Sequence, residues 1–354
     1  MDKKNNNVGT KMSDDYNNSG KIQTKFGNLL VDELSKTIKE ININNPERLQ
    51  NNNEPFIICD LGCSLGLSSI QFLQEIFTEI RKINKNLPIE VYLEDTPFND
   101  FSLTLKTVNE NLKEFSGVKY HTLPISFYEK LFPANSVDLF YSSFAMNWLP
   151  GCPFSQNQLI YACDNNKEFQ PDYDKMESYI NNCWGTQMEL RNTELKPNGR
   201  ILVNIPLIEL DPTKSANVLL KYRLAKKVVN NVLSNYGCTE LSDKMSIPLS
   251  FNSEKNLRET SKNKINITDI VKVESGQRNA DREQYAAEYS VFFTSFTFGI
   301  YKDALSKKFK AIEVEEILAN IKNQWKEALL KIDNFYYPSR CVVKGRKLRD
   351  MSKF

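Results

Sequence analysis

The stretch from Phe56 to Gly66 constrains the fold most, because it combines a buried strand, a tight turn and the start of a helix. Four apolar residues lead into Asp60, and Gly62 and Gly66 follow in the pattern D-x-G-x-x-x-G. Apolar side chains then recur at helical spacing. Glycines let a backbone approach a ligand closely, and free N–H groups at a helix start offer donors. The stretch predicts a ligand-binding loop, or alternatively a structural β-turn-α unit.

Strands and helices alternate through the first two-thirds of the chain. We expect strands at 55–60, 89–95, 118–123, 136–142 and 201–205, with helices at 67–84, 101–114 and 176–195. This alternation predicts a parallel sheet with right-handed crossovers, whose ligands lie beyond the carboxyl ends of the strands. Asp60, Asp95 and Ser142 all stand at such ends. Asp95 is the predicted ligand of a ribose, since a carboxylate accepts two hydroxyl hydrogen bonds; capping its own loop is the alternative.

The remaining chain contributes further expected elements. An amphipathic helix is predicted over 24–41, then an Asn-rich solvated loop over 42–54. Strands are predicted at 266–274 and 335–344. Helices are predicted at 286–305, which is rich in aromatic residues, and at 314–332. Residues 1–15 are polar and predicted to be disordered.

Composition excludes several classes of protein. A net charge of +2 argues against a nucleic-acid partner, and no apolar run is long enough to span a bilayer. The N-terminus lacks the apolar core of a signal peptide, and seven scattered cysteines fit free thiols, so we expect a cytoplasmic protein. A single histidine, His121, argues against a His-based triad or a His-rich metal site, and we expect no metal.

Large apolar residues follow the fourth strand directly, over 143–154. Phe144 and Trp148 stand among them, just past a strand end and beside the expected ligand. This position predicts the wall of a small aromatic pocket, with ordinary core packing as the alternative.

Five motifs share one order and spacing with a known family. They are Tyr16 with Gln23, Asp60-Leu-Gly-Cys-Ser64, Asp95-Thr96-Pro97-Phe98-Asn99-Asp100-Phe101, Ser126-Phe127-Tyr128 with Leu131-Phe132-Pro133, and Ser142-Ser143-Phe144 with Trp148-Leu149. On these motifs the chain resembles the SABATH methyltransferases, the salicylate, benzoate and theobromine group of S-adenosylmethionine-dependent enzymes. The resemblance extends from about Tyr16 to Lys344.

The resemblance implies an α/β fold of the class I methyltransferase type: a Rossmann-like, mostly parallel sheet of about seven strands with an α-helical cap over the active site. One methyltransferase domain would then cover 16–354. Its core would comprise about 50–145, 184–206, 263–275 and 312–345, and its cap the inserts 146–183, 207–262 and 280–310.

The resemblance also implies roles for individual residues. Those implied to contact the cofactor S-adenosyl-L-methionine are Tyr16, Asp60, Gly62, Cys63, Ser68, Asp95, Thr96, Ser126, Phe127 and Ser143. Those implied to line the substrate site are Gln23, Phe144, Asn147, Trp148 and Tyr161, with Gln23 and Trp148 holding a carboxylate. Two departures affect the substrate: Phe144 replaces the family's usual Tyr, and Asn147 replaces its frequent Met or His.

The implied activity is the formation of a methyl ester on a small apolar or aromatic carboxylic acid, and a homodimer is the implied assembly. Such an acid is already ionised at pH 7, so the enzyme needs positioning and exclusion of water rather than a catalytic base. N-methylation of a small heterocycle is the alternative within the family. A nicotinamide-dependent oxidoreductase and a non-catalytic ligand-binding relative are the alternatives outside this chemistry.

Overall fold

A computed structural model describes residues 20–151, 161–162, 173–208, 212–273, 281–332 and 339–348, with side chains from 26 onward except those of 161–162, 173 and 212–219. The α-helices are α1 (Gly20–Asn44), α2 (Pro46–Gln50), α3 (Leu67–Ile83), α4 (Phe101–Asn111), α5 (Tyr173–Glu194), α6 (Pro212–Asn235), α7 (Glu254–Ser261), α8 (Arg282–Leu305) and α9 (Ala311–Leu330). The strands are β1 (Phe56–Leu61), β2 (Ile89–Asp95), β3 (Val118–Pro124), β4 (Val137–Ser143), β5 (Tyr161–Ala162), β6 (Leu195–Ile208), β7 (Ser250–Ser253), β8 (Asn266–Val273) and β9 (Ser339–Arg346). A 3-10 helix covers Thr239–Met245.

Seven strands form the body of one sheet, in the order β3-β2-β1-β4-β6-β9-β8. The pairs β1–β2, β2–β3, β1–β4 and β4–β6 are parallel, while β9 runs antiparallel to both β6 and β8. The short β7 and β5 extend the far end of β6. Strand order therefore reverses between β1 and β4, and ligands in such sheets bind at this switch point. The α/β fold with a mostly parallel sheet is confirmed.

Helices cover both faces of the sheet, as the apolar run of β1 requires. Phe56 and Ile58 pack with α1 and α3 on one face, and Cys59 and Leu61 pack on the other face. All four side chains are fully buried. Because successive side chains of a strand point to opposite faces, a continuous apolar run indicates a strand covered on both sides.

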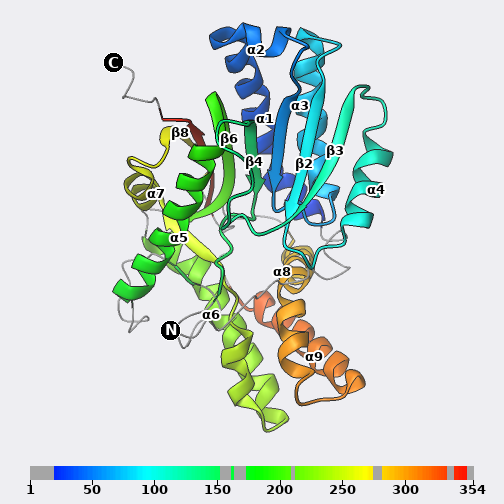
Figure 1. The fold of residues 1–354 in the computed structure, drawn as a ribbon. Coiled ribbons are helices and arrows are strands. Elements are labelled where there is room, and N and C mark those ends of the chain that lie inside the picture. The colour runs from blue at the N-terminus through cyan, green and yellow to red at the C-terminus, as the bar shows by residue number, and fades with distance from the viewer. Residues whose placement is uncertain are drawn as a thin grey trace, which may run out of the picture.

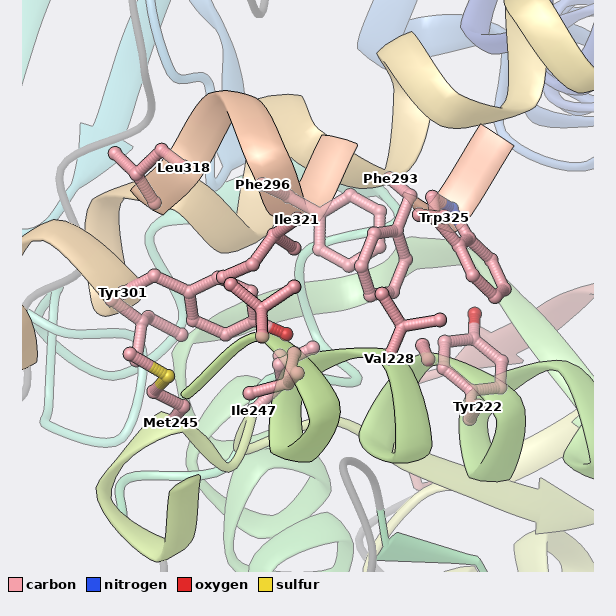
Figure 2. Close-up of a cluster of buried hydrophobic side chains, with 14 of the residues drawn as sticks. Tyr222, Val228, Met245, Ile247, Phe293, Phe296, Tyr301, Leu318, Ile321 and Trp325 are labelled. Carbon is pink, nitrogen blue, oxygen red and sulfur yellow. The ribbon is translucent and has the colours of Figure 1, made fainter. Parts of the chain in front are cut away.

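Apart from the core around the sheet, a separate hydrophobic cluster lies beyond one end of the sheet, where α6, α8 and α9 pack together (Figure 1). Figure 2 shows its centre, in which Trp325 and Ile321 of α9 face Tyr222 and Val228 of α6 and Phe293 of α8. The aromatic-rich stretch predicted as a buried helix is α8, which confirms that prediction. Within the range 312–345, the apolar face of α9 packs on α6 and α8, and β9 joins the sheet.

The solvated loop predicted over 42–54 was also wrong in part. Helix α1 continues to Asn44, and Pro46 starts the short helix α2, whose Leu49 is fully buried. Arg48 of α2 donates to Asp138 of β4 through Nε at 2.5 Å and Nη2 at 2.6 Å. One buried leucine and one ion pair thus dock a helix too short to be stable alone.

Candidate functional site

The turn between β1 and α3 has a left-handed backbone conformation, which favours glycine, at two glycine positions. Gly62 has φ +78° and Gly66 has φ +82°. A Cβ atom on Gly62 would overlap the Cβ of Ala145, at the end of β4. Ser64, with φ +49°, is held by its carbonyl, which accepts Asn99 Nδ2 at 2.7 Å and Thr104 Oγ1 at 2.8 Å. The turn is therefore fixed against both β4 and α4.

Two adjacent acids at the end of β2 hold this turn from the other side. The two carboxylate oxygens of Asp95 each accept one backbone hydrogen bond. Oδ2 accepts the N–H of Ser64 and Oδ1 accepts the N–H of Thr96, both at 2.7 Å. Glu94 accepts the N–H of Gly62 through Oε2 at 2.9 Å. Burial raises the pKa of both carboxyl groups. The sequence predicted a role for Asp95 but missed Glu94, because a fully buried glutamate in an apolar strand carries no motif of its own.

Asp60 lies underneath the turn rather than open to solvent. Its Oδ2 accepts Ser69 Oγ at 2.5 Å and Tyr141 Oη at 2.9 Å, and the residue is 4% exposed. Burial raises the pKa of Asp60 to about 7, against the opposing effect of these two hydrogen bonds. Cys63 is also buried, and burial raises the pKa of its thiol well above the ordinary value. Both residues therefore pack and order the loop in this structure.

We expect Asp60 to make ligand-free stability depend on pH. Burial raises the pKa of Asp60 from ~3.9 in the unfolded chain to about 7 in the folded protein. Between these pH values the unfolded chain releases the proton while the folded protein keeps it, so the free energy of unfolding falls as pH rises. The contribution of Asp60 to stability is therefore complete below the unfolded pKa and is lost as pH rises through the folded pKa. Between pH 5 and pH 8 the wild type should lose ~2–3 kcal/mol more free energy of unfolding than Asp60→Asn. Urea unfolding at both pH values measures this, and parallel profiles of the two proteins would contradict it.

A cavity with about 770 Å³ of empty space, including space open to solvent, lies between the start of α3 and the carboxyl end of β4. Its lining residues are Phe26, Ser68, Phe72, Ser143, Phe144, Asn147, Trp148, Pro206, Tyr222, Leu249, Phe251, Phe292 and Phe296. None of these lining side chains carries a charge. A largely aromatic lining with a few polar groups is typical of a small-molecule site.

Five residues singled out from the sequence line this cavity together: Ser68, Ser143, Phe144, Asn147 and Trp148. The family resemblance implied that the inserts 207–262 and 280–310 cover the site, but sequence reasoning did not name the residues of α6, β7 and α8 that line the cavity. Tyr16 lies outside the described residues, as do the side chains of Gln23 and Tyr161. The backbone of Gln23 lies in α1, one turn before Phe26.

The cavity wall is strained at Phe144, whose φ of +57° is unusual for a residue with a side chain. Asn204 of β6 holds it there, because its carbonyl accepts the N–H of Phe144 at 2.8 Å. The amide of Asn204 also donates to the Phe26 carbonyl at 3.1 Å and to Ser143 Oγ at 3.4 Å. One buried asparagine thus joins α1 to the end of β4.

The loop after β3 contains Ser126 and Phe127 and is connected to the cavity wall by the next residue. The Tyr128 hydroxyl donates a hydrogen bond to the Trp148 carbonyl at 2.8 Å.

His121 lies apart from the cavity lining and stacks on Tyr92, with 4.6 Å between the ring centroids. The described residues include no group of three or more His, Cys, Asp or Glu side chains arranged to bind a metal ion. In the same part of the chain, no helix has both the length and the apolar surface of a membrane span.

Comparison with known proteins identifies relatives of this chain. The family model described as "SAM dependent carboxyl methyltransferase" matches residues 4–344. The chain is 28% identical over 201 residues to a salicylate/benzoate carboxyl methyltransferase of Arabidopsis thaliana, covering 53% of this chain and 51% of that protein. It is 25% identical over 298 residues to a probable 7-methylxanthine methyltransferase of Theobroma cacao, covering 78% and 80%. In several such alignments the chain spans about half the length of the curated relative.

A solved structure, loganic acid methyltransferase with SAH, has the same fold. It superimposes with a TM-score of 0.75 at 17% identity, covering 96% of this chain and 99% of the other.

Proposed function

The chain belongs to the family of SAM-dependent carboxyl methyltransferases, and on this premise we propose that it converts a small apolar or aromatic carboxylic acid into its methyl ester. The observation that carries the proposal is the cavity at the switch point of the sheet. Its walls are aromatic, and its polar groups are hydroxyls, one amide and one indole N–H, with no charged side chain among the described lining residues.

The turn and its acids fit S-adenosyl-L-methionine. Each carboxylate oxygen of Asp95 accepts one backbone N–H and so keeps a lone pair for a ribose hydroxyl. Gly66 caps α3 without a side chain, which leaves the N–H groups of the first turn of α3 for the cofactor's carboxylate. Ser68 and Ser143 border both this region and the cavity. We propose that the cofactor also contacts Gly62, Cys63, Thr96, Ser126 and Phe127. Asp60 and Tyr16 are proposed as further contacts, although Tyr16 lies outside the described residues.

When bound, this cofactor supplies an electrophilic methyl group on a sulfonium. The chain's own residues orient the acceptor and exclude water. Trp148 and Asn147 provide N–H donors for the acid, and Gln23 is proposed to add a third. The rings of Phe144, Phe292 and Phe296 surround its apolar part. Because a carboxylic acid with a pKa of ~4 is ionised at pH 7, no residue has to remove a proton.

The proposal is tested by incubating the protein with methyl-labelled S-adenosylmethionine and a panel of acceptors. The panel contains salicylate, benzoate, indole-3-acetate, jasmonic acid, loganic acid, a fatty acid and 7-methylxanthine. We expect a methyl ester from at least one acid. N-methylation of 7-methylxanthine without any methyl ester would favour the alternative within the family, and failure to bind the cofactor while binding an acid would favour a non-catalytic relative.

Asn147 is expected to influence which acid is preferred. The residue is 5% exposed, lines the cavity, and its Oδ1 has no hydrogen-bond partner. A buried amide favours a substrate that brings a second polar group, a preference of ~1 kcal/mol or a factor of ~5. Asn147→Leu should therefore lower the ratio of kcat/KM for salicylate over benzoate by that factor, because the two acids differ by one hydroxyl. A ratio unchanged within about twofold would contradict this role.

Three further properties are proposed. The described cysteines are free thiols, which supports a reducing compartment such as the cytoplasm. A homodimer is proposed from the family resemblance, and sedimentation of the purified protein tests it. We also propose that residues 16–354 form one methyltransferase domain, with the α6, α8 and α9 cluster as its cap.

A further inference from the structure

Tyr128 completes the Ser-Phe-Tyr motif, yet no role follows for it from the cofactor or the substrate. Its hydroxyl donates to the carbonyl of Trp148 at 2.8 Å, twenty residues away, and its ring lies 5.1 Å from that of Phe127. Around it pack Leu149, Met176, Ile180 and Cys183. Tyr128 therefore joins two segments: the loop proposed to contact the cofactor and the wall proposed to hold the acid.

The loop that carries Tyr128 is hydrogen-bonded to α5. Arg191 donates to the carbonyls on either side of Tyr128, those of Phe127 at 3.3 Å and Glu129 at 2.9 Å. Glu194 accepts the N–H groups of Leu131 at 2.6 Å and Phe132 at 3.2 Å. Arg191 Nε lies 2.8 Å from Glu194 Oε2, and both side chains are 0% exposed. A buried ion pair thus sets the position from which Tyr128 reaches Trp148.

The wall end is held from its other side by the segment around β7. The N–H of Leu149 donates to the Pro248 carbonyl at 2.6 Å, and the N–H of Ser250 donates to the Asn147 carbonyl at 2.8 Å. The Trp148 carbonyl between them is the group that Tyr128 contacts. The indole of Trp148 extends into the cavity lining. A shift of Tyr128 would therefore move the backbone from which the indole projects.

We propose that Tyr128 is a positioning residue that couples cofactor binding to acid binding. Contacts of the cofactor with Ser126 and Phe127 would shift the position of the adjacent Tyr128, and its hydroxyl would transmit this shift to the backbone of Trp148. The inference rests on the proposed function, because it takes the two segments as the cofactor and acid sites. Coupling between sites is reciprocal, so the acid tightens cofactor binding by the same factor.

The test compares the wild type with Tyr128→Phe, which removes the hydroxyl and keeps the ring. The Kd of the acid that the wild type methylates fastest is measured by calorimetry with and without saturating SAH. We expect SAH to tighten acid binding ~10-fold in the wild type and ~2-fold in Tyr128→Phe, a loss equal to the net value of one hydrogen bond. Both measurements are made at a temperature at which each protein is fully folded without ligand, because SAH also stabilises the folded state.

A second readout needs no acid. SAH should change the emission of Trp148, measured as the wild-type signal minus that of Trp148→Phe, and the change should be at most about half as large in Tyr128→Phe. The matched control is Tyr179→Phe, since Tyr179 packs in the same cluster but donates to the Gly151 carbonyl at 3.5 Å. We expect the control to retain the wild-type coupling factor and signal.

The outcomes separate the two proposals. Equal coupling and equal emission changes in wild type and Tyr128→Phe, or a wild type without coupling, would overturn the role of Tyr128. A wild type that binds SAH but neither binds nor methylates any acid of the panel would instead contradict the proposed function. In that case the emission measurement alone would test whether Tyr128 connects the loop after β3 to the cavity wall at Trp148.

Discussion

Asp95→Asn is expected to weaken SAH binding by ~30- to 100-fold. The substitution removes the negative charge and one of two acceptor oxygens, both of which already accept a backbone N–H at 2.7 Å. Hydrogen bonds to a charged group contribute ~1.5–3 kcal/mol each, and the loss of one gives a factor of this size. Asp95 is partly buried, so water only incompletely replaces the missing acceptor. Isothermal calorimetry with SAH measures the effect.

Asp100→Asn is the matched control for this experiment. Asp100 lies in the same β2–α4 connection, is exposed, and caps α4 by accepting the N–H of Leu103 at 3.0 Å. Its substitution should leave the Kd for SAH within about twofold, because amide and carboxylate cap helices about equally well. The melting temperature of each ligand-free variant reports separately on damage to the turn. Wild-type affinity in a folded Asp95→Asn protein would place the ribose elsewhere.

Trp148→Ala is expected to lower kcat/KM for the preferred acid by at least ~100-fold while the Kd for SAH changes by less than about threefold. The change removes an indole donor and a large part of the aromatic wall, and truncating such a pocket residue costs ~3 kcal/mol or more. Cofactor affinity should survive, because alanine keeps the backbone carbonyl that Tyr128 contacts. Steady-state kinetics and calorimetry measure the two quantities. We expect Gln23→Ala to act in the same direction.

Trp148→Phe measures the contribution of the indole N–H donor separately from that of the aromatic ring in the cavity wall. It keeps an aromatic ring and loses the N–H group, so we expect a fall in kcat/KM of ~10-fold, carried mainly by KM. If Trp148→Ala abolished SAH binding and left KM for the acid unchanged, Trp148 would belong to the cofactor site and the proposed arrangement would be wrong.

The sheet and the position of Asp95 were predictable because their signals are local. An apolar run followed by Asp60 and two glycines defines β1 and its turn, and the stretch 89–95 ends at the observed end of β2. Parallel strands place their carboxyl ends at one edge, so nearness of the β1 turn and Asp95 followed without coordinates. The strand that contains Ser142 and Ser143 was predicted for the same reason, and its end lines the cavity.

The cap could not be predicted in the same way. Tyr222 of α6, Phe251 of β7 and Phe292 of α8 meet in one cavity wall, although up to seventy residues separate them. Helical periodicity marks an apolar face but does not name the partner that covers it. The helix predicted over 314–332 is an example, because only the structure shows that its apolar face packs on α6 and α8.

The sequence by itself determined the strand–turn–helix unit at Phe56–Gly66, the helical and strand periods around it, and the motif residues at strand ends. Each of these depends on neighbours within a few residues. Only the tertiary structure decided that Asp60 is buried beneath the turn, that Asn204 holds Phe144 at a positive φ, and that Tyr128 contacts Trp148. Burial and long-range hydrogen bonds arise from packing between distant segments, and no local pattern specifies which segments meet.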